Sequence, residues 1–185
     1  MKEPNMLKLF IGWVVIALLI GCSSKEEQAL INAYTKNNTY HKNLQRTEKV
    51  ELYDGNTSVA ILTATHLYTP NLDKNDTRDE VFIIAVSFEE PEISRLRFDI
   101  DSTEASEHEY VLTLNKKKAS KVVHLDASDE KLKNISFVTG WGEYYEVKFP
   151  HAGTKFSLEF ANNNYGKGKL NFSKVPKFVY TQKGF

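Results

Sequence analysis

An alternation of apolar and polar residues begins near Thr47 and continues almost to the end of the chain. Residues 95–101 give the clearest example, because Leu96, Phe98 and Ile100 each stand between two charged residues. Successive side chains of a β-strand point to opposite faces of a sheet, so this spacing predicts a strand with one buried and one hydrated face. The same alternation recurs in residues 82–88, 110–114, 145–149, 156–160 and 170–172, and apolar runs at 50–53, 59–68, 121–125, 135–138 and 178–181 are further candidate strands.

The candidate strands are short, and segments rich in Gly, Asn, Asp and Pro separate them. Their spacing of about 8 to 13 residues, without a second strongly helical segment, is typical of an antiparallel β-sandwich. We expect an all-β fold of this kind over residues 47–185, in an immunoglobulin-like variant. It lacks the Cys, Trp, Cys pattern of antibody domains, because Cys22 is the only cysteine of the chain.

The first 21 residues have the composition of a secretory signal peptide. Lys2 and Lys8 make the start basic, and residues 9–20 form an apolar run that Gly21 and Cys22 follow. This run of 12 residues is shorter than the roughly 20 that a membrane-spanning helix needs. We therefore expect residues 1–21 to be removed on export.

Residues 19–22, Leu-Ile-Gly-Cys, resemble the lipobox of bacterial lipoproteins. The resemblance implies that the thiol of Cys22 receives a diacylglyceryl group and that the leader is cut between Gly21 and Cys22. Because two or three acyl chains together bind a bilayer stably, the mature protein is expected to be anchored to a membrane through lipid. Ser23 rather than aspartate follows the cysteine, which in this family implies the outer membrane of the cell envelope. The mature chain is loosely similar to small envelope lipoproteins with an immunoglobulin-like sandwich.

Residues 22–46 are predicted to connect the lipid anchor to the sandwich. Ser24 and Glu27 have the spacing of a capping box, in which each side chain binds the backbone amide of the other residue. This motif predicts a short helix over residues 25–34. The polar segment 35–46 is then expected to act as a tether.

Charge and composition argue against several classes of function. The chain has 24 basic and 24 acidic residues, a balance that disfavours nucleic acid or an anionic membrane surface as the main partner. It contains no phosphate-binding glycine loop, dinucleotide fingerprint or nucleophile elbow, so we expect neither a cofactor nor an enzymatic activity. The five histidines are scattered without the spacing of a metal motif, and no metal site is predicted.

Two aromatic loops are the candidate binding features. One contains Trp141 and Tyr144 between glycines and a strand, and the other carries Tyr165 after three asparagines. Exposed aromatic rings on a rigid β scaffold can anchor a protein partner or stack on sugar rings. We therefore expect a lipid-anchored envelope protein whose sandwich binds another envelope or surface protein. The alternatives are a carbohydrate or small ligand at the Trp141 loop, or a Trp141 side chain that folds back and closes one end of the sandwich.

Two asparagines are candidate glycosylation sites. Asn56 and Asn75 each begin an Asn-X-Ser/Thr sequon, and each has an aspartate two residues earlier. This pattern resembles the acceptor of bacterial periplasmic oligosaccharyltransferases. Both asparagines fall in predicted turns, where the chain of an exported domain is accessible to modifying enzymes.

Overall fold

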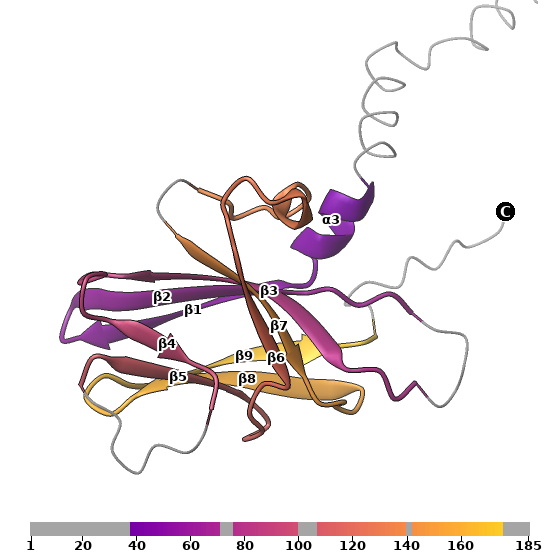
Figure 1. Ribbon diagram of the computed structural model, residues 1–185. Helices are drawn as coiled ribbons and strands as arrows, with labels where there is room; N and C mark the ends of the chain where they lie inside the picture. The colour runs from indigo at the N-terminus through magenta and orange to yellow at the C-terminus, as the bar shows by residue number, and fades with distance from the viewer. Residues whose placement is uncertain (1–37, 71–75, 100–106, 140–141, 176–185) are drawn as a thin grey trace, which may run out of the picture. The chain divides into compact units, whose positions relative to one another are not determined.

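The computed structural model describes residues 38–70, 76–99, 107–139 and 142–175, which form two packed β-sheets (Figure 1). Neighbouring strands are antiparallel, except that β4 is parallel to β5. The five-stranded sheet contains, in spatial order, β1 (Thr47–Asp54), β2 (Thr57–His66), β3 (Glu80–Phe88), β7 (Glu143–Phe149) and β6 (Lys121–Leu125). The four-stranded sheet contains β4 (Arg95–Arg97), β5 (Glu109–Leu114), β8 (Lys155–Asn162) and β9 (Gly166–Ser173).

The strand order is that of an immunoglobulin-like domain. Four strands of the first sheet follow the order β2-β3-β7-β6, and three of the second follow the order β5-β8-β9. Constant-type immunoglobulin domains have this arrangement, with strands A, B, E and D in one sheet and C, F and G in the other. β1 extends the first sheet beyond β2, and β4 extends the second beyond β5. The predicted all-β, immunoglobulin-like sandwich is therefore confirmed.

The main hydrophobic core lies between the two sheets. On β8, Phe156, Leu158 and Phe160 are buried, while the residues between them are partly exposed. Phe82 on β3 and Leu112 on β5 belong to the same core. Since burying one large apolar side chain contributes roughly 1.5–3 kcal/mol, this core is the main source of stability.

A second hydrophobic core covers the outer face of the five-stranded sheet. Ile83 on β3 and Tyr144 on β7 pack in one cluster with Leu132, which lies in the 3-10 helix η1 (Glu130–Leu132) between β6 and β7. The alternation predicted a hydrated outer face, and this prediction is wrong for β3 and β7, because a loop covers that face. Residues 135–138 belong to this loop and do not form the strand predicted for them.

β4 is shorter than the alternation at residues 95–101 predicts. It ends at Arg97, because Phe98 leaves the strand and its carbonyl oxygen accepts a hydrogen bond of 3.0 Å from the backbone N–H of Ala119. The candidate strand at residues 178–181 lies outside the described residues.

Part of the predicted tether is a helix, α3 (Asn38–Leu44). Thr47 Oγ1 donates a hydrogen bond of 2.8 Å to the carbonyl of Asn43, and Asn43 Nδ2 donates one of 3.1 Å to the carbonyl of Asn134. These bonds attach the second half of segment 35–46 to the sandwich, and the role of the segment as a tether stays a prediction. The helix predicted at residues 25–34 lies outside the described residues. No helix within the described ranges has the length and apolar character needed to cross a membrane.

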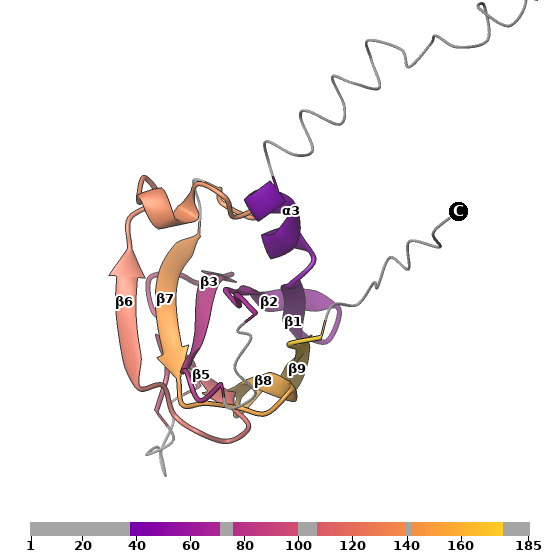
Figure 2. The same ribbon diagram turned by 90° about the vertical axis from the view of Figure 1, so that its right-hand side faces the viewer.

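The two sheets meet differently at their two sides (Figure 2). At β1 and β9, which we call the closed side, a Cβ atom added at Gly168 would overlap Cγ2 of Val50, so these strands are in close contact. The other side lies between β6 and β4, and we call it the open side. There the sheets are connected by an edge-to-face contact of Phe98 with Tyr145, with 5.4 Å between ring centroids, and by the bond between Ala119 and Phe98.

Candidate functional site

Tyr144 is a core residue, contrary to its predicted role as a surface binding residue. Its side chain is 1% exposed. Its hydroxyl group accepts a hydrogen bond of 2.6 Å from the N–H of Thr139 and donates one of 2.7 Å to the carbonyl of the same residue. Tyr144 therefore fixes the loop that precedes β7 and is not available to stack on a ligand. Trp141 lies outside the described residues.

Tyr165 lies near the surface in the hairpin between β8 and β9, and its ring stacks on Tyr110 at a centroid distance of 6.3 Å. The buried side chain of Asn162 holds this hairpin. Its Oδ1 accepts hydrogen bonds from the backbone N–H groups of Asn164 and Tyr165, and its Nδ2 donates to the carbonyl of Glu109. The Tyr165 ring is thus held in place before any ligand arrives.

A polar cleft of about 290 Å³, which we call the Tyr165 cleft, adjoins this ring. Burial raises the pKa of Tyr110, and the neighbouring Tyr165 and Glu90 raise it further. Carboxylates beside an aromatic ring can accept hydrogen bonds from sugar hydroxyls or from cationic groups. Besides the two tyrosines, the cleft is lined by Asp54, Thr57, Val59, Glu89, Glu90, Ser94 and His108.

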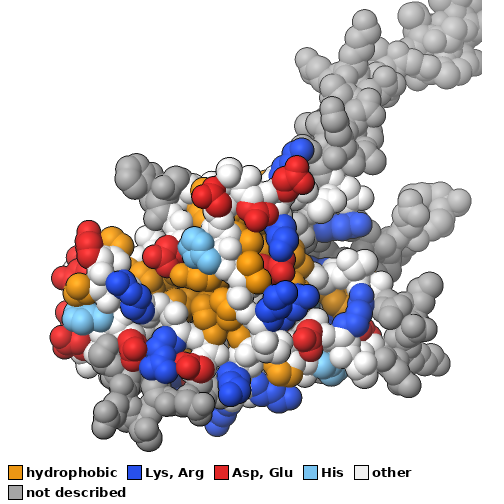
Figure 3. Space-filling model, in the orientation of Figure 1, with side chains coloured by type: hydrophobic (Ala, Val, Ile, Leu, Met, Phe, Trp, Pro, Cys, Tyr) orange, Lys and Arg blue, Asp and Glu red, His pale blue; other side chains and the backbone are white. Residues whose placement is uncertain are grey.

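An apolar surface, which we call the open seam, follows the open side of the sandwich. Figure 3 shows hydrophobic side chains gathered on this face, between the positions of β4 and β6 in Figure 1. β6 is the last strand of its sheet, so its outer edge pairs with no strand among the described residues. Val122 on β6 is 40% exposed. The open seam consists of Val122 and four partly buried residues, Leu96, Phe98, Ala119 and Tyr145.

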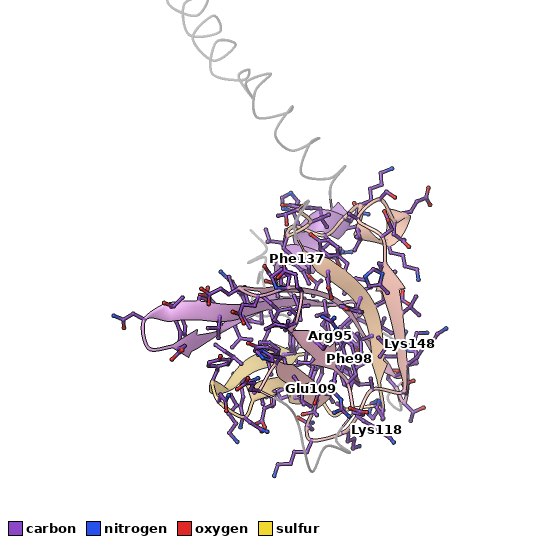
Figure 4. The ribbon with its side chains drawn as sticks, turned by 60° about the vertical axis from the view of Figure 1, so that its left-hand side comes forward. Arg95, Phe98, Glu109, Lys118, Phe137 and Lys148 are labelled. Atoms are coloured by element: carbon purple, nitrogen blue, oxygen red, sulfur yellow. The ribbon has the colours of Figure 1, made fainter. Side chains whose placement is uncertain are left out.

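Charged and polar groups surround the open seam. Figure 4 shows Arg95 and Phe98 in the middle of this face, with Phe137 above them and Lys118 below. Arg97 forms ion pairs of 3.0 Å with Asp99 and 3.1 Å with Glu109. Tyr145 donates a hydrogen bond of 2.6 Å to Glu143, and burial together with this carboxylate raises the pKa of Tyr145. The seam therefore combines apolar side chains with charged and polar groups that lie among and around them.

A buried charged cluster connects the two sheets at the start of β3, and the sequence analysis did not find it. Glu80, whose side chain is 2% exposed, accepts hydrogen bonds from Lys174 Nζ at 2.6 Å, from the N–H of Ala152 at 3.0 Å and from His66 Nε2 at 3.0 Å. Burial alone would raise the pKa of Glu80, but these bonds outweigh it and hold the pKa below its ordinary value. Burial also lowers the pKa of His66, and the nearby carboxylate offsets this only in part.

Because its three donors already occupy both oxygens of Glu80, we interpret this cluster as structural. Sequence offers a weak signal for it, a glutamate at the start of the apolar run of β3. Within the described ranges, no group of three His, Cys, Asp or Glu side chains is arranged to hold a metal ion.

The other predicted site residues are those of lipidation, leader cleavage and glycosylation, and only one of them lies in the described part of the chain. Asn56 is exposed in the turn between β1 and β2, where Gly55 has a φ of +57°. Its glycosylation stays a prediction. Gly21, Cys22 and Asn75 lie outside the described residues.

Comparison with known proteins identifies no relative: no protein-family model matches the chain, and no curated protein or solved structure is significantly similar to it.

Proposed function

We propose that this chain is a lipid-anchored protein of the bacterial cell envelope whose sandwich binds another envelope or surface protein. The observation that carries the proposal is the open seam beside the free edge of β6. The proposed role is binding rather than catalysis.

Two physical properties of the open seam support a protein partner. An edge strand presents unpaired backbone N–H and C=O groups, which can pair with an extended segment of another chain. The exposed Val122 and the partly buried Phe98 and Tyr145 add an apolar surface directly beside that edge. Apolar patches with a polar rim often mark protein interaction sites.

Lipid anchoring is supported by the lipobox-like residues 19–22 and by the length of the apolar run before them. We propose the outer membrane as the location, on the basis of Ser23. Replacing Cys22 with alanine should abolish fatty-acid labelling of the protein in its native host. Labelling that persists in the Cys22→Ala variant would contradict the anchor.

A position-specific crosslinking experiment tests the proposed partner surface. A photoreactive amino acid is placed at Val122 on the open side, or at Tyr53 on β1 as a matched control, since both side chains are large, apolar and exposed. We expect a discrete crosslinked protein from position 122 in intact cells and none from position 53. Equal products from both positions, or none from position 122, would remove the open seam from the interface.

The Tyr165 cleft favours a second candidate function, the binding of a carbohydrate or other small ligand. The supporting observation is the fixed Tyr165 ring beside three carboxylates, those of Asp54, Glu89 and Glu90. Screening envelope glycans by saturation-transfer NMR should give signals that the Tyr165→Ala variant loses and a Tyr53→Ala variant keeps. Signals that survive in Tyr165→Ala would exclude the cleft.

A further inference from the structure

Three cationic side chains surround the ring of Tyr68, just beyond the end of β2. The guanidinium carbon of Arg46 lies 5.1 Å from the ring centroid, Lys174 Nζ lies 5.5 Å away, and the guanidinium carbon of Arg78 lies 6.0 Å away. Such distances are typical of cation–π contacts. The arrangement concentrates positive charge at the end of the sandwich where α3 leads into β1.

Two of these three cations have a carboxylate partner. Lys174 is paired with Glu80, and Arg78 is paired with Asp76 at 2.8 Å. Arg46 Nη1 donates to the carbonyl oxygen of Tyr68, and no ion pair found among the described residues includes Arg46. Burial lowers the pKa of Arg46, which reflects the cost of removing its charge from water. Because a guanidinium group has five N–H donors, Arg46 keeps donors for a further acceptor.

A cleft of about 320 Å³ lies beside Arg46 and Tyr68. Lys42, Gln45 and Asn171 bring further donors to its wall, and Glu48 brings one carboxylate. Apolar surface comes from Phe172 and from Val175, which is 53% exposed. The cleft therefore combines the half-buried Arg46, a lysine, neutral donors and one carboxylate with apolar groups.

We propose that this cleft binds a phosphate-bearing anion with an apolar body, and that Arg46 is the residue that recognises the phosphate. The planar guanidinium group can bind two phosphate oxygens at once, and Lys42 can add a second charge. A bound phosphate would supply Arg46 with a counter-charge, which no ion pair among the described residues gives it. The site lies away from the open seam and does not depend on the partner binding proposed there, whereas the lipid source argued below rests on the proposed anchor at Cys22.

The apolar wall favours a lipid headgroup over a free phosphate as the source of this anion. Asn38, the first residue of α3, lies 16 residues after Cys22. A fully extended segment of this length reaches roughly 55 Å, so a lipid anchor at Cys22 leaves the cleft within reach of headgroups. One headgroup in one cleft is compatible with the balanced charge of the chain, which disfavours adsorption to an anionic surface.

The test titrates the full chain, held in non-ionic detergent, with two probes. One probe is the short-chain lipid dihexanoyl phosphatidylglycerol, and the other is inorganic phosphate. NMR of the arginine Nε–H groups reports directly on the guanidinium group of Arg46. We expect saturable binding of the lipid that shifts the Arg46 resonance, and an Arg46→Gln variant with about tenfold weaker affinity. The matched control is Arg97→Gln, which removes an arginine already paired with two carboxylates and should bind as the parent does.

The outcomes separate the two sources of phosphate. Tighter binding of the lipid than of inorganic phosphate, with the same dependence on Arg46, supports a headgroup site. Equal binding of both probes supports the phosphate site but overturns the lipid source. Binding of neither probe, or unchanged affinity in Arg46→Gln, overturns the proposal. If Arg46→Gln does not fold, Lys42→Gln decides, because Lys42 is exposed and its loss should weaken lipid binding about threefold. Unchanged affinity in Lys42→Gln would then count against the site.

Discussion

The two sheets pack closely at the closed side of the sandwich and less completely at the open side. On the closed side, β9 approaches β1 so closely that Gly168 has no room for a side chain beside Val50. On the open side, the contact of Phe98 with Tyr145 leaves apolar groups partly exposed. The chain thus completes its own interior on the closed side, whereas on the open side it leaves apolar side chains partly exposed, and there we propose that a partner binds. Substitutions that affect the two sides unequally test this interpretation.

The largest effect is expected at Glu80, whose cluster joins β2, β3 and the end of β9. Replacing Glu80 with alanine leaves the largely buried ammonium group of Lys174 without its carboxylate and the N–H of Ala152 without its acceptor. Removing one partner of a buried ion pair typically costs about 3–5 kcal/mol, so the free energy of unfolding should fall by that amount in urea denaturation. Glu159→Ala is the control, because Glu159 pairs loosely with two lysines at 3.7 and 3.8 Å and should cost below about 1 kcal/mol. Similar losses in both variants would show that the Glu80 cluster contributes no more to stability than the surface ion pairs of Glu159.

Gly168→Ala should have the next largest effect, because its Cβ atom would overlap Cγ2 of Val50. Overpacking of this kind typically costs about 1–3 kcal/mol. A second substitution, Val50→Ala, should restore part of the loss when combined with Gly168→Ala. Gly153→Ala serves as the control, since no atom lies within 4 Å of the added Cβ, and it should be neutral or slightly stabilising. A neutral Gly168→Ala variant would contradict the close contact of β1 with β9.

Acid should destabilise the fold through His66. Burial lowers the pKa of folded His66, while the unfolded value is about 6.5. Below the unfolded pKa, and until the pH reaches the lower folded pKa, the unfolded chain binds a proton at His66 that the folded chain does not. The free energy of unfolding therefore falls as the pH falls, by at most about 1.4 kcal/mol per pH unit. Urea denaturation between pH 7.5 and 5 should show this slope in the parent chain and a smaller one in His66→Gln. The lowered pKa of Glu80 adds a further loss at lower pH. Identical slopes would show that another group binds the proton.

The sequence alone predicted the sandwich because the pattern that indicates a half-buried strand lies within each strand. In β8 the buried residues Phe156, Leu158 and Phe160 follow the period of two that a half-buried strand requires. The outer core escaped prediction because it depends on a loop that folds over β3 and β7. The continuous apolar run of β3, with Ile83 and Ile84 both fully buried, carried a signal of burial on both faces.

The buried polar cluster and the candidate binding residues were harder to predict, because their partners are distant along the chain. Glu80 binds the N–H of Ala152, 72 residues away, and no local pattern relates the two. Tyr144 and Tyr145 are adjacent in sequence, yet the first belongs to the outer core and the second faces the open seam. Tyr165 is partly buried against the core, and its role in binding stays a prediction. Asn162, which fixes its loop, has no local sequence signal that distinguishes it from other turn asparagines.

The smallest effect on stability is expected on the open side, where the functional effect should be large. Val122→Glu places a charge at an exposed edge position, so its free energy of unfolding should stay within about 0.5 kcal/mol of the parent. The same charge disfavours an apolar partner surface and should abolish recovery of the partner when the full chain is purified from envelope extract. Tyr53→Glu is the counterpart on β1, with a similarly exposed side chain, and should leave that recovery intact. Loss of the partner in both variants would mean that the two sides do not differ in function, whereas loss in Val122→Glu alone would assign the interface to the side that the chain leaves open.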